Sequence, residues 1–147
     1  MNMPKNGHMG EIQNIIIMTG VGGDCTNFAS QCIYAGGMQM NYTNIFGWYY
    51  INGNNKSPSW TGVEFLYNFL TNNNGIGPKG EDTYLEKLEI GDIIQLSFDG
   101  NIFTHTLVVV HKGINSYNIK IACHSYDAFN KILAEYTFKN MRCIHII

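Results

Sequence analysis

The sequence predicts an α+β domain in which helices from the first half pack on an antiparallel sheet formed by the second half. Two observations indicate this fold class. Apolar residues recur at helical spacing within 24–35 and again after Thr61, whereas β-branched runs separated by turn residues dominate from Ile93 onward. Helices that precede a series of strands, and do not alternate with them, are typical of α+β folds.

The first helix is expected at residues 24–35. Asp24 is suited to the N-cap, and the apolar residues Phe28 and Cys32 fall on one face at helical spacing. The pair Gly36-Gly37 is expected to end this helix.

A second helix is expected from about Thr61 to Asn72. Thr61 and Glu64 have the spacing of a capping box, and apolar residues supply one helical face after them. Residues 38–58, which are rich in asparagine and aromatic residues, are expected to form a loop between the two helices.

The second half is expected to form an antiparallel meander. A turn at Asp99-Gly100 predicts one hairpin, and a turn centred on Ile114-Asn115 predicts the next. The strands are expected at residues 93–98, 102–111, 119–124, 136–138 and 141–147.

Composition narrows the possible partners and the location of the chain. The 147 residues suffice for one domain with a core, and the formal net charge is −2 with no basic cluster, so nucleic acid is not an expected partner. The apolar run 15–18 is too short to span a membrane and does not form a signal peptide. We therefore expect a protein that is cytoplasmic, or that is exported as part of a larger or processed chain.

The four cysteines do not indicate a disulfide framework. Cys25 and Cys32 would lie two helical turns apart, which is about 10 Å along the axis and too far for a bridge. Cys123 lies in an apolar stretch that is typical of a small buried residue.

Cys25 is the strongest candidate for a functional residue. It follows Gly22-Gly23-Asp24 at the start of the first predicted helix. A helix N-terminus carries partial positive charge, which favours a thiolate over a thiol, and glycines allow close approach of a substrate to the backbone.

Two histidines are candidates for partners of Cys25. A second hairpin centred on residues 114–115 would place His105 directly opposite His124, on the same face of the sheet. A first hairpin centred on residues 99–100 would place His105 opposite Ile94, at the end of an apolar face that could pack on the Cys25 helix. One imidazole could then act as the general base while the other orients it. A register slip of one residue would move one histidine to the other face.

The segment 22–32, Gly-Gly-Asp-Cys-Thr-Asn-Phe-Ala-Ser-Gln-Cys, resembles the signature of the bacterial putative amidase domain family. This family belongs to the papain-like superfamily and is related to the NlpC-type cell-wall hydrolases. The resemblance covers residues 22–147 and leaves residues 1–21 as an atypical N-terminal segment. Further matches follow in order at residues 36–37, 47–50, 59–60, 91–95, 104–106 and 124–127.

The resemblance implies a papain-like fold and a catalytic role for several residues. Cys25 matches the nucleophile and His105 the base. His124 best matches the third catalytic position, and Asp127 is a competing candidate for that position. No metal or other cofactor is implied.

Three further residues are candidates for contact with a substrate. Trp48 and Trp60 could line a groove, although aromatic residues beside glycine also serve as loop anchors. Asp24 could approach a substrate or could simply cap the helix.

The expected function is hydrolysis of an amide or peptide bond through a thioester acyl-enzyme. The resemblance implies a peptide or amide substrate in the bacterial cell wall, such as peptidoglycan. One alternative is a catalytically silent binding domain, because residues 1–21 lack both the tyrosine-bearing helix of relatives and a papain-type glutamine before the cysteine. A zinc site of one cysteine and two histidines is a further alternative, but no short paired spacing supports it.

Overall fold

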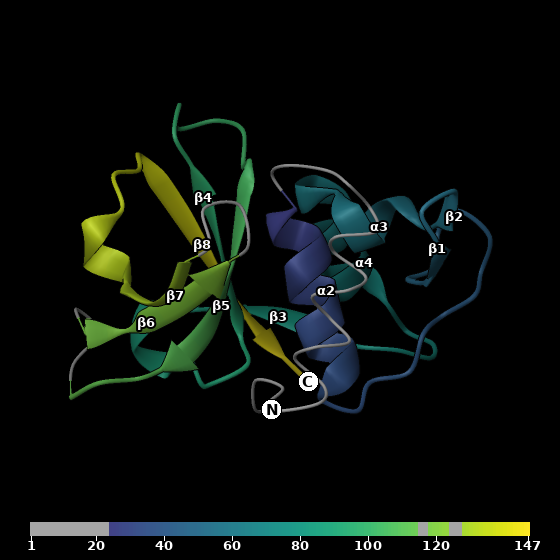
Figure 1. Ribbon diagram of the computed structural model, residues 1–147, viewed down its shortest axis with the longest axis horizontal. Coiled ribbons are helices and arrows are strands. Elements are labelled where there is room, and N and C mark those ends of the chain that lie inside the picture. Colours follow the sequence, from purple (N-terminus) through teal and green to yellow (C-terminus); the bar gives the residue numbers. More distant parts are fainter. Residues whose placement is uncertain (1–23, 115–117, 124–127) are drawn as a thin grey trace.

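The computed structural model describes residues 24–114, 118–123 and 128–147. Within these residues, helices lie on one face of a six-stranded antiparallel sheet (Figure 1). The described part of the chain therefore has an α+β arrangement. Its helices come from the first half of the sequence, and all strands of the large sheet come from the second half.

Helix α2 (Cys25–Ala35) lies where the sequence predicts it and begins one residue later. Every residue from Cys25 to Ile33 is buried, because α2 lies between the sheet and a layer of aromatic residues. The backbone N–H groups of Gly36 and Gly37 donate to carbonyls in the last turn and end the helix. Gly37 has a φ of 108°, which glycine adopts without steric strain.

Two helices replace the single helix expected after Thr61. Helix α3 (Pro58–Thr61) is one turn long, and α4 (Val63–Asn72) follows after Gly62. The expected capping box does not form, because Gly62 occupies the N-cap of α4 and no side chain caps the helix. Glu64 instead forms an ion pair with Arg142 at 2.8 Å.

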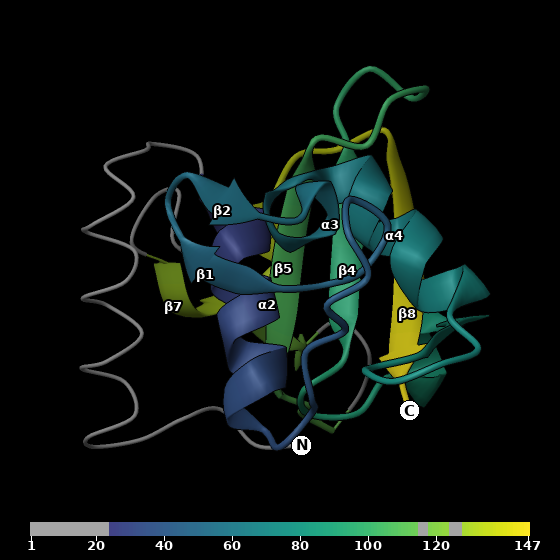
Figure 2. The same cartoon turned by 90° about the vertical axis from the view of Figure 1, so that its right-hand side faces the viewer.

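The large sheet has the strand order β3-β8-β4-β5-β6-β7. Strands β4, β5 and β6 form the expected meander, and β7 (Ala128–Ile132), which the sequence did not predict, extends it. Strand β8 lies between β3 and β4 instead of at the end of the meander. Figure 2 shows α2 and α4 in front of the sheet, with α2 before β5 and α4 on the side of β8. The strands are β3 (Gly80–Thr83), β4 (Ile93–Ser97), β5 (His105–His111), β6 (Lys120–Cys123), β7 (Ala128–Ile132) and β8 (Asn140–Ile146).

Several short elements differ from the sequence prediction. The expected loop 38–58 contains a two-stranded sheet of β1 (Tyr50–Asn52) and β2 (Asn55–Lys56). Strand β3 has the polar sequence Gly-Glu-Asp-Thr, so no apolar alternation reveals it, and backbone pairing with β8 holds it in place. Residues 136–138 do not form the expected strand, because the 3₁₀ turn η3 (Leu133–Glu135) and an irregular segment lead into β8.

The register of both hairpins differs from the prediction. In the first, Leu96 and not Ile94 lies opposite His105, a shift of two residues that leaves Ile94, Leu96 and His105 on the same face. In the second, Val108 pairs with Ala122, a shift of one residue from the predicted pairing. A shift of one residue exchanges the two faces, so the expected pairing of His105 with His124 does not follow from this register.

The two faces of the sheet bury separate apolar clusters. The helix-side cluster comprises Phe28, Ala29, Cys32, Ile33, Trp48, Trp60, Leu66, Leu70, Ile93, Val108, Ala122, Ile144 and Ile146. The cluster of the opposite face comprises Cys25, Leu88, Ile94, Leu96, Leu107, Val109, Ile119, Ile121, Cys123, Leu133 and Cys143. Cys25 therefore differs from the apolar residues later in α2, because it packs with the second cluster.

Candidate active site

Cys25 lies at the first position of α2 and contacts the backbone of β5. Its Sγ accepts a hydrogen bond from the backbone N–H of Thr106 at 3.3 Å. The Val109 N–H donates to the Asp92 carbonyl on the β4 side, so by alternation the Thr106 N–H points away from β4. The sulfur thus lies beside the edge of β5 that faces away from β4, where it is hydrogen bonded to Thr106, the residue after His105. The Cys25 residue is only 3% exposed.

The residues after Cys25 hold the start of α2 against the sheet. Thr26 Oγ1 and Thr106 Oγ1 are hydrogen bonded at 2.9 Å, and both residues are buried. This contact joins the first turn of the helix to β5 directly. It therefore fixes Cys25 relative to the strand that begins with His105.

The next polar residues of the same motif bind the tryptophans. Asn27 Oδ1 accepts a hydrogen bond from the indole N–H of Trp60 at 2.9 Å, and Ser30 Oγ accepts one from Trp48 at 3.1 Å. Ser30 also donates to the Trp60 carbonyl, and Gln31 donates to Asn27 Oδ1. Much of the motif around Cys25 therefore binds the buried tryptophans and positions the helix.

The predicted groove role of the tryptophans is not supported. Trp48 is 0% exposed and Trp60 is 2% exposed, and their ring centroids lie 4.6 Å apart in the core. Indoles buried in this way leave no surface for a ligand. Their burial favours the alternative given by the sequence, in which these aromatic residues anchor loops.

Asp24 occupies the N-cap position of α2 but does not cap it with its side chain. The Asp24 carbonyl accepts the hydrogen bond from the Phe28 N–H at 2.9 Å, whereas the carboxylate forms no capping hydrogen bond. The residue is buried. The pKa of the Tyr50 phenol is raised, first by burial and second by the negative charge of Asp24.

His105 begins β5 on the face opposite the helices. The residue is 5% exposed, and burial lowers the pKa of its imidazole, which therefore favours the neutral form at neutral pH. The ring is near those of Phe98 and Tyr136, with a centroid distance of 6.1 Å in each case. A neutral imidazole can accept a proton, as a general base must.

Cys123 and Tyr136 lie near His105, and the sequence interpretation identified neither as a candidate site residue. Cys123 Sγ lies 3.6 Å from His105 Nε2 and 3.5 Å from the Tyr136 hydroxyl. The observed register continues from Val108 and Ala122 to bring Cys123 beside Leu107, on the face of His105. The predicted register assigned Cys123 to the other face, which is why its position beside the imidazole was missed.

Two of the predicted site residues, His124 and Asp127, lie outside the described residues. The structure thus brings Cys25 to the backbone position next to His105, and it adds Cys123 and Tyr136 around the imidazole. The catalytic roles of Cys25, His105 and a third residue stay predictions.

Comparison with known proteins assigns the family. Residues 12–147 match the family described as "Putative amidase domain". The chain belongs to this amidase family. The family name indicates a hydrolase that acts on amides, and the match covers Cys25, His105 and the strands between and after them.

One curated relative of this amidase domain is an uncharacterized protein, YhbB of Bacillus subtilis (strain 168). The two are 34% identical over 107 residues, which cover 71% of this chain and 34% of that protein. The amidase domain therefore spans about a third of the length of the relative. No solved structure matches the chain.

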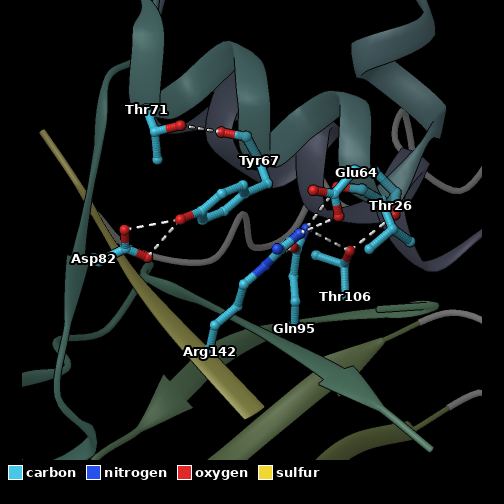
Figure 3. A network of polar contacts seen from close by, with 9 residues as sticks. Thr26, Glu64, Tyr67, Thr71, Asp82, Gln95, Thr106 and Arg142 are labelled. Carbon is cyan, nitrogen blue, oxygen red and sulfur yellow. Dashed lines mark hydrogen bonds and ion pairs between the residues drawn. The ribbon is translucent and has the colours of Figure 1, made fainter. Parts of the chain in front are cut away.

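A network of polar contacts, buried at Thr106 and Gln95 and exposed at Glu64, ties the start of α2 to α4 (Figure 3). Thr106 Oγ1 accepts a hydrogen bond from Gln95 Nε2 at 3.3 Å, and Gln95 Oε1 accepts one from Arg142 Nε at 2.8 Å. The Arg142 guanidinium lies 3.6 Å from the centroid of the Tyr67 ring and pairs with Glu64 on α4. The network connects the start of α2 to α4 through three adjacent strands.

The described part of the amidase domain contains no cluster of three or more histidine, cysteine or acidic residues that could hold a metal ion. Among the same residues, no helix has both the length and the apolar character needed to cross a bilayer.

Proposed function

We propose that this domain hydrolyses an amide bond, with Cys25 as the nucleophile and His105 as the general acid and base. The observation that carries the proposal is the hydrogen bond between Cys25 Sγ and the backbone N–H of Thr106, the residue next to His105. This N–H and the N-terminus of α2 direct partial positive charge at the sulfur, an environment typical of nucleophilic cysteines. The family assignment supports the same class of reaction.

In the proposed reaction, neutral His105 accepts the proton of the Cys25 thiol. The thiolate attacks the carbonyl carbon, and the imidazolium returns the proton to the departing amine, which leaves a thioester on Cys25. Water then attacks the thioester while His105 accepts its proton and passes it to the sulfur. The net reaction consumes one amide and one water and forms a carboxylic acid and an amine.

Two other groups complete the proposed site. The backbone N–H of Cys25 belongs to the first turn of α2, whose N–H groups have no acceptor within the helix, and it is suited to bind the oxyanion. The third catalytic residue, which orients His105, is proposed to be His124, with Asp127 as the alternative. Such a site, in a papain-like fold, would suit a peptide or amide of the bacterial cell wall, a substrate class that rests on the resemblance alone.

Cys123 is the competing nucleophile, because its sulfur lies 3.6 Å from the imidazole of His105. The other two thiols are poor candidates. Burial raises the pKa of the Cys143 thiol to about 11 and raises that of Cys32 still further, so both stay protonated at neutral pH. The test must therefore separate Cys25 from Cys123.

We expect iodoacetamide to alkylate Cys25 before the other three cysteines at pH 7, as measured by peptide mass spectrometry. Cys25→Ala should abolish hydrolysis of a panel of N-acetyl amino-acid p-nitroanilides, whereas the matched variant Cys123→Ala should keep Cys25 alkylation. Full activity in Cys25→Ala, or first alkylation of Cys123, would contradict the proposal. Because Cys25 is only 3% exposed, absence of any alkylation would favour the silent binding domain.

A further inference from the structure

A cavity lies on the sheet face opposite the helices, and one of the residues that line it, Tyr136, is a neighbour of His105. Its volume is about 460 Å³, within the range of small-ligand sites. The segment that contains η3 forms one wall, and β8 contributes Met141. In Figure 1 this segment, between β7 and β8, lies on the far side of the sheet from α2. The principal lining side chains are Leu85, Leu133, Ala134, Tyr136, Phe138 and Met141.

Tyr136 connects this cavity to the candidate active site. Its ring lines the cavity and lies 6.1 Å from the His105 ring, and its hydroxyl lies 3.5 Å from Cys123 Sγ. The sheet register gives a second connection. Leu96 lies opposite both His105 on β5 and Met141 on β8, so the three side chains form one row across the same face. The row leads from the imidazole to the cavity wall.

The chemistry of the cavity favours an uncharged, apolar occupant. No lysine, arginine, aspartate or glutamate lines it. Burial, followed by the hydrogen bond to Cys123, raises the pKa of the Tyr136 phenol, so this hydroxyl stays neutral at any ordinary pH. The Lys131 ammonium lies 4.3 Å from the centroid of the Tyr136 ring and helps to hold the ring in place.

We propose that this cavity, hereafter the apolar subsite, binds the apolar side chain of the substrate residue that adjoins the scissile amide. The inference rests on the proposed function, because it makes the substrate a peptide or amide with a branched aliphatic or aromatic side chain beside the reacting carbonyl. Burial of such a side chain contributes enough free energy for a preference of roughly tenfold or more over glycine.

The first test measures binding without any reaction. Methyl NMR of protein labelled at the methionine methyl groups should show a saturable shift of Met141 with N-acetyl-leucinamide and none with N-acetyl-glycinamide. Ala134→Trp, which places a large side chain in the subsite from an exposed position, should remove the shift. Glu135→Trp, on the same 3₁₀ turn but outside the lining residues, should keep it.

The second test measures how the subsite affects reaction at Cys25. The thiolate displaces chloride from a chloromethyl ketone, so N-acetyl-leucyl and N-acetyl-glycyl chloromethyl ketones report acyl preference through the rate of Cys25 alkylation. We expect the leucyl reagent to react about tenfold faster in the wild-type protein and in Glu135→Trp. In Ala134→Trp the ratio should approach one.

The outcomes separate the subsite from the proposed function. Equal rates for the two reagents, or no Met141 shift with N-acetyl-leucinamide, would overturn the subsite even if Cys25 is alkylated rapidly. A Met141 shift without alkylation of Cys25 by any reagent would overturn the hydrolase and would support an apolar binding site on this face.

Discussion

The two faces of the six-stranded sheet differ in what covers them and in what they can do. On one face, α2, α3 and α4 cover an apolar core that includes two fully buried tryptophans, and a polar network ties the helices to the strands. On the other face, a short 3₁₀ turn and irregular chain leave a cavity beside His105. Adjacent side chains of β5 lie on different faces of the sheet. Thr106 is hydrogen bonded to Thr26 of α2, whereas the ring of His105 lies near Cys123 and Tyr136.

This division separates a face with a helix-covered apolar core from a face that carries the candidate site and a cavity. We expect the first face to stabilise the fold, and we propose that the second binds a ligand. Cys25 lies where the two meet, because it starts the central helix yet packs with the cluster of the His105 face. The following predictions test this division, beginning with the largest effect.

Truncation of a tryptophan should separate the two faces most clearly. Trp60→Ala removes a buried indole and one of the two hydrogen-bond donors to Asn27 Oδ1, so we expect a loss of about 3–5 kcal/mol in the free energy of unfolding. Phe98→Ala, which truncates a half-exposed ring near His105, should cost about 1 kcal/mol or less. Urea unfolding measures both, and similar losses would show that the faces do not differ in this way.

Removal of one hydroxyl should weaken the link between α2 and the sheet. Thr106→Val keeps the shape of the side chain but deprives Thr26 Oγ1 and Gln95 Nε2 of a partner, so we expect a loss of about 1–3 kcal/mol. Thr104→Val, at an exposed position just before β5, is the matched control and should change little. If chemical denaturation gives equal stabilities for the two variants, the buried hydroxyl is not important for the frame.

The smallest effect should be a difference in pH dependence between two histidines. His145 Nδ1 lies 3.0 Å from Asp92 Oδ1, and this hydrogen bond is the main cause of the raised pKa of His145. Its stabilising contribution is therefore complete below the pKa of the unfolded chain and is lost as pH rises through the higher folded value. Because the His145 side chain is 37% exposed, solvent screening limits the contribution to less than about 1 kcal/mol.

His105 should show the opposite sign. Burial lowers its pKa, so its presence destabilises the folded state as pH falls below the pKa of the unfolded chain. Relative to wild type, His145→Gln should lose more stability at pH 5.5 than at pH 8.5, and His105→Gln should gain stability at the acid end. His111→Gln, at an exposed position, serves as the control in the same thermal-unfolding series. Parallel pH profiles for all three variants would contradict the assignment.

Local features of the sequence predicted the helix that carries Cys25 well. Its apolar spacing and the glycine pair at 36–37 act within a few residues of the chain, so the helix lies within one residue of the expected bounds. The capping pattern at Thr61 and Glu64 failed because Gly62 starts a new helix and Glu64 pairs with Arg142, far away in sequence.

Strand pairing was harder to predict than strand position. The first hairpin has a longer connection than an Asp99-Gly100 turn, since β4 ends at Ser97 and β5 begins at His105. An irregularity between Val109 and His111 shifts the second hairpin by one residue. The two-residue shift in the first hairpin kept His105 on the same strand face as Ile94 and Leu96, as expected. The helices cover the opposite face of the sheet, and not the His105 face as the sequence suggested. The one-residue shift in the second hairpin is the reason that the contact between Cys123 and the His105 ring was not predicted.

By itself, the sequence determined that a cysteine begins a buried helix and that a histidine lies on a strand of an antiparallel sheet. Both follow from short-range patterns, because helix hydrogen bonds and strand alternation involve residues that are close in the chain. Only the tertiary structure decided that Cys25 contacts Thr106, that Cys123 and Tyr136 surround His105, and that the tryptophans are buried. Those contacts depend on strand register and on packing between distant segments. A shift of one residue in the register is enough to change which side chains meet.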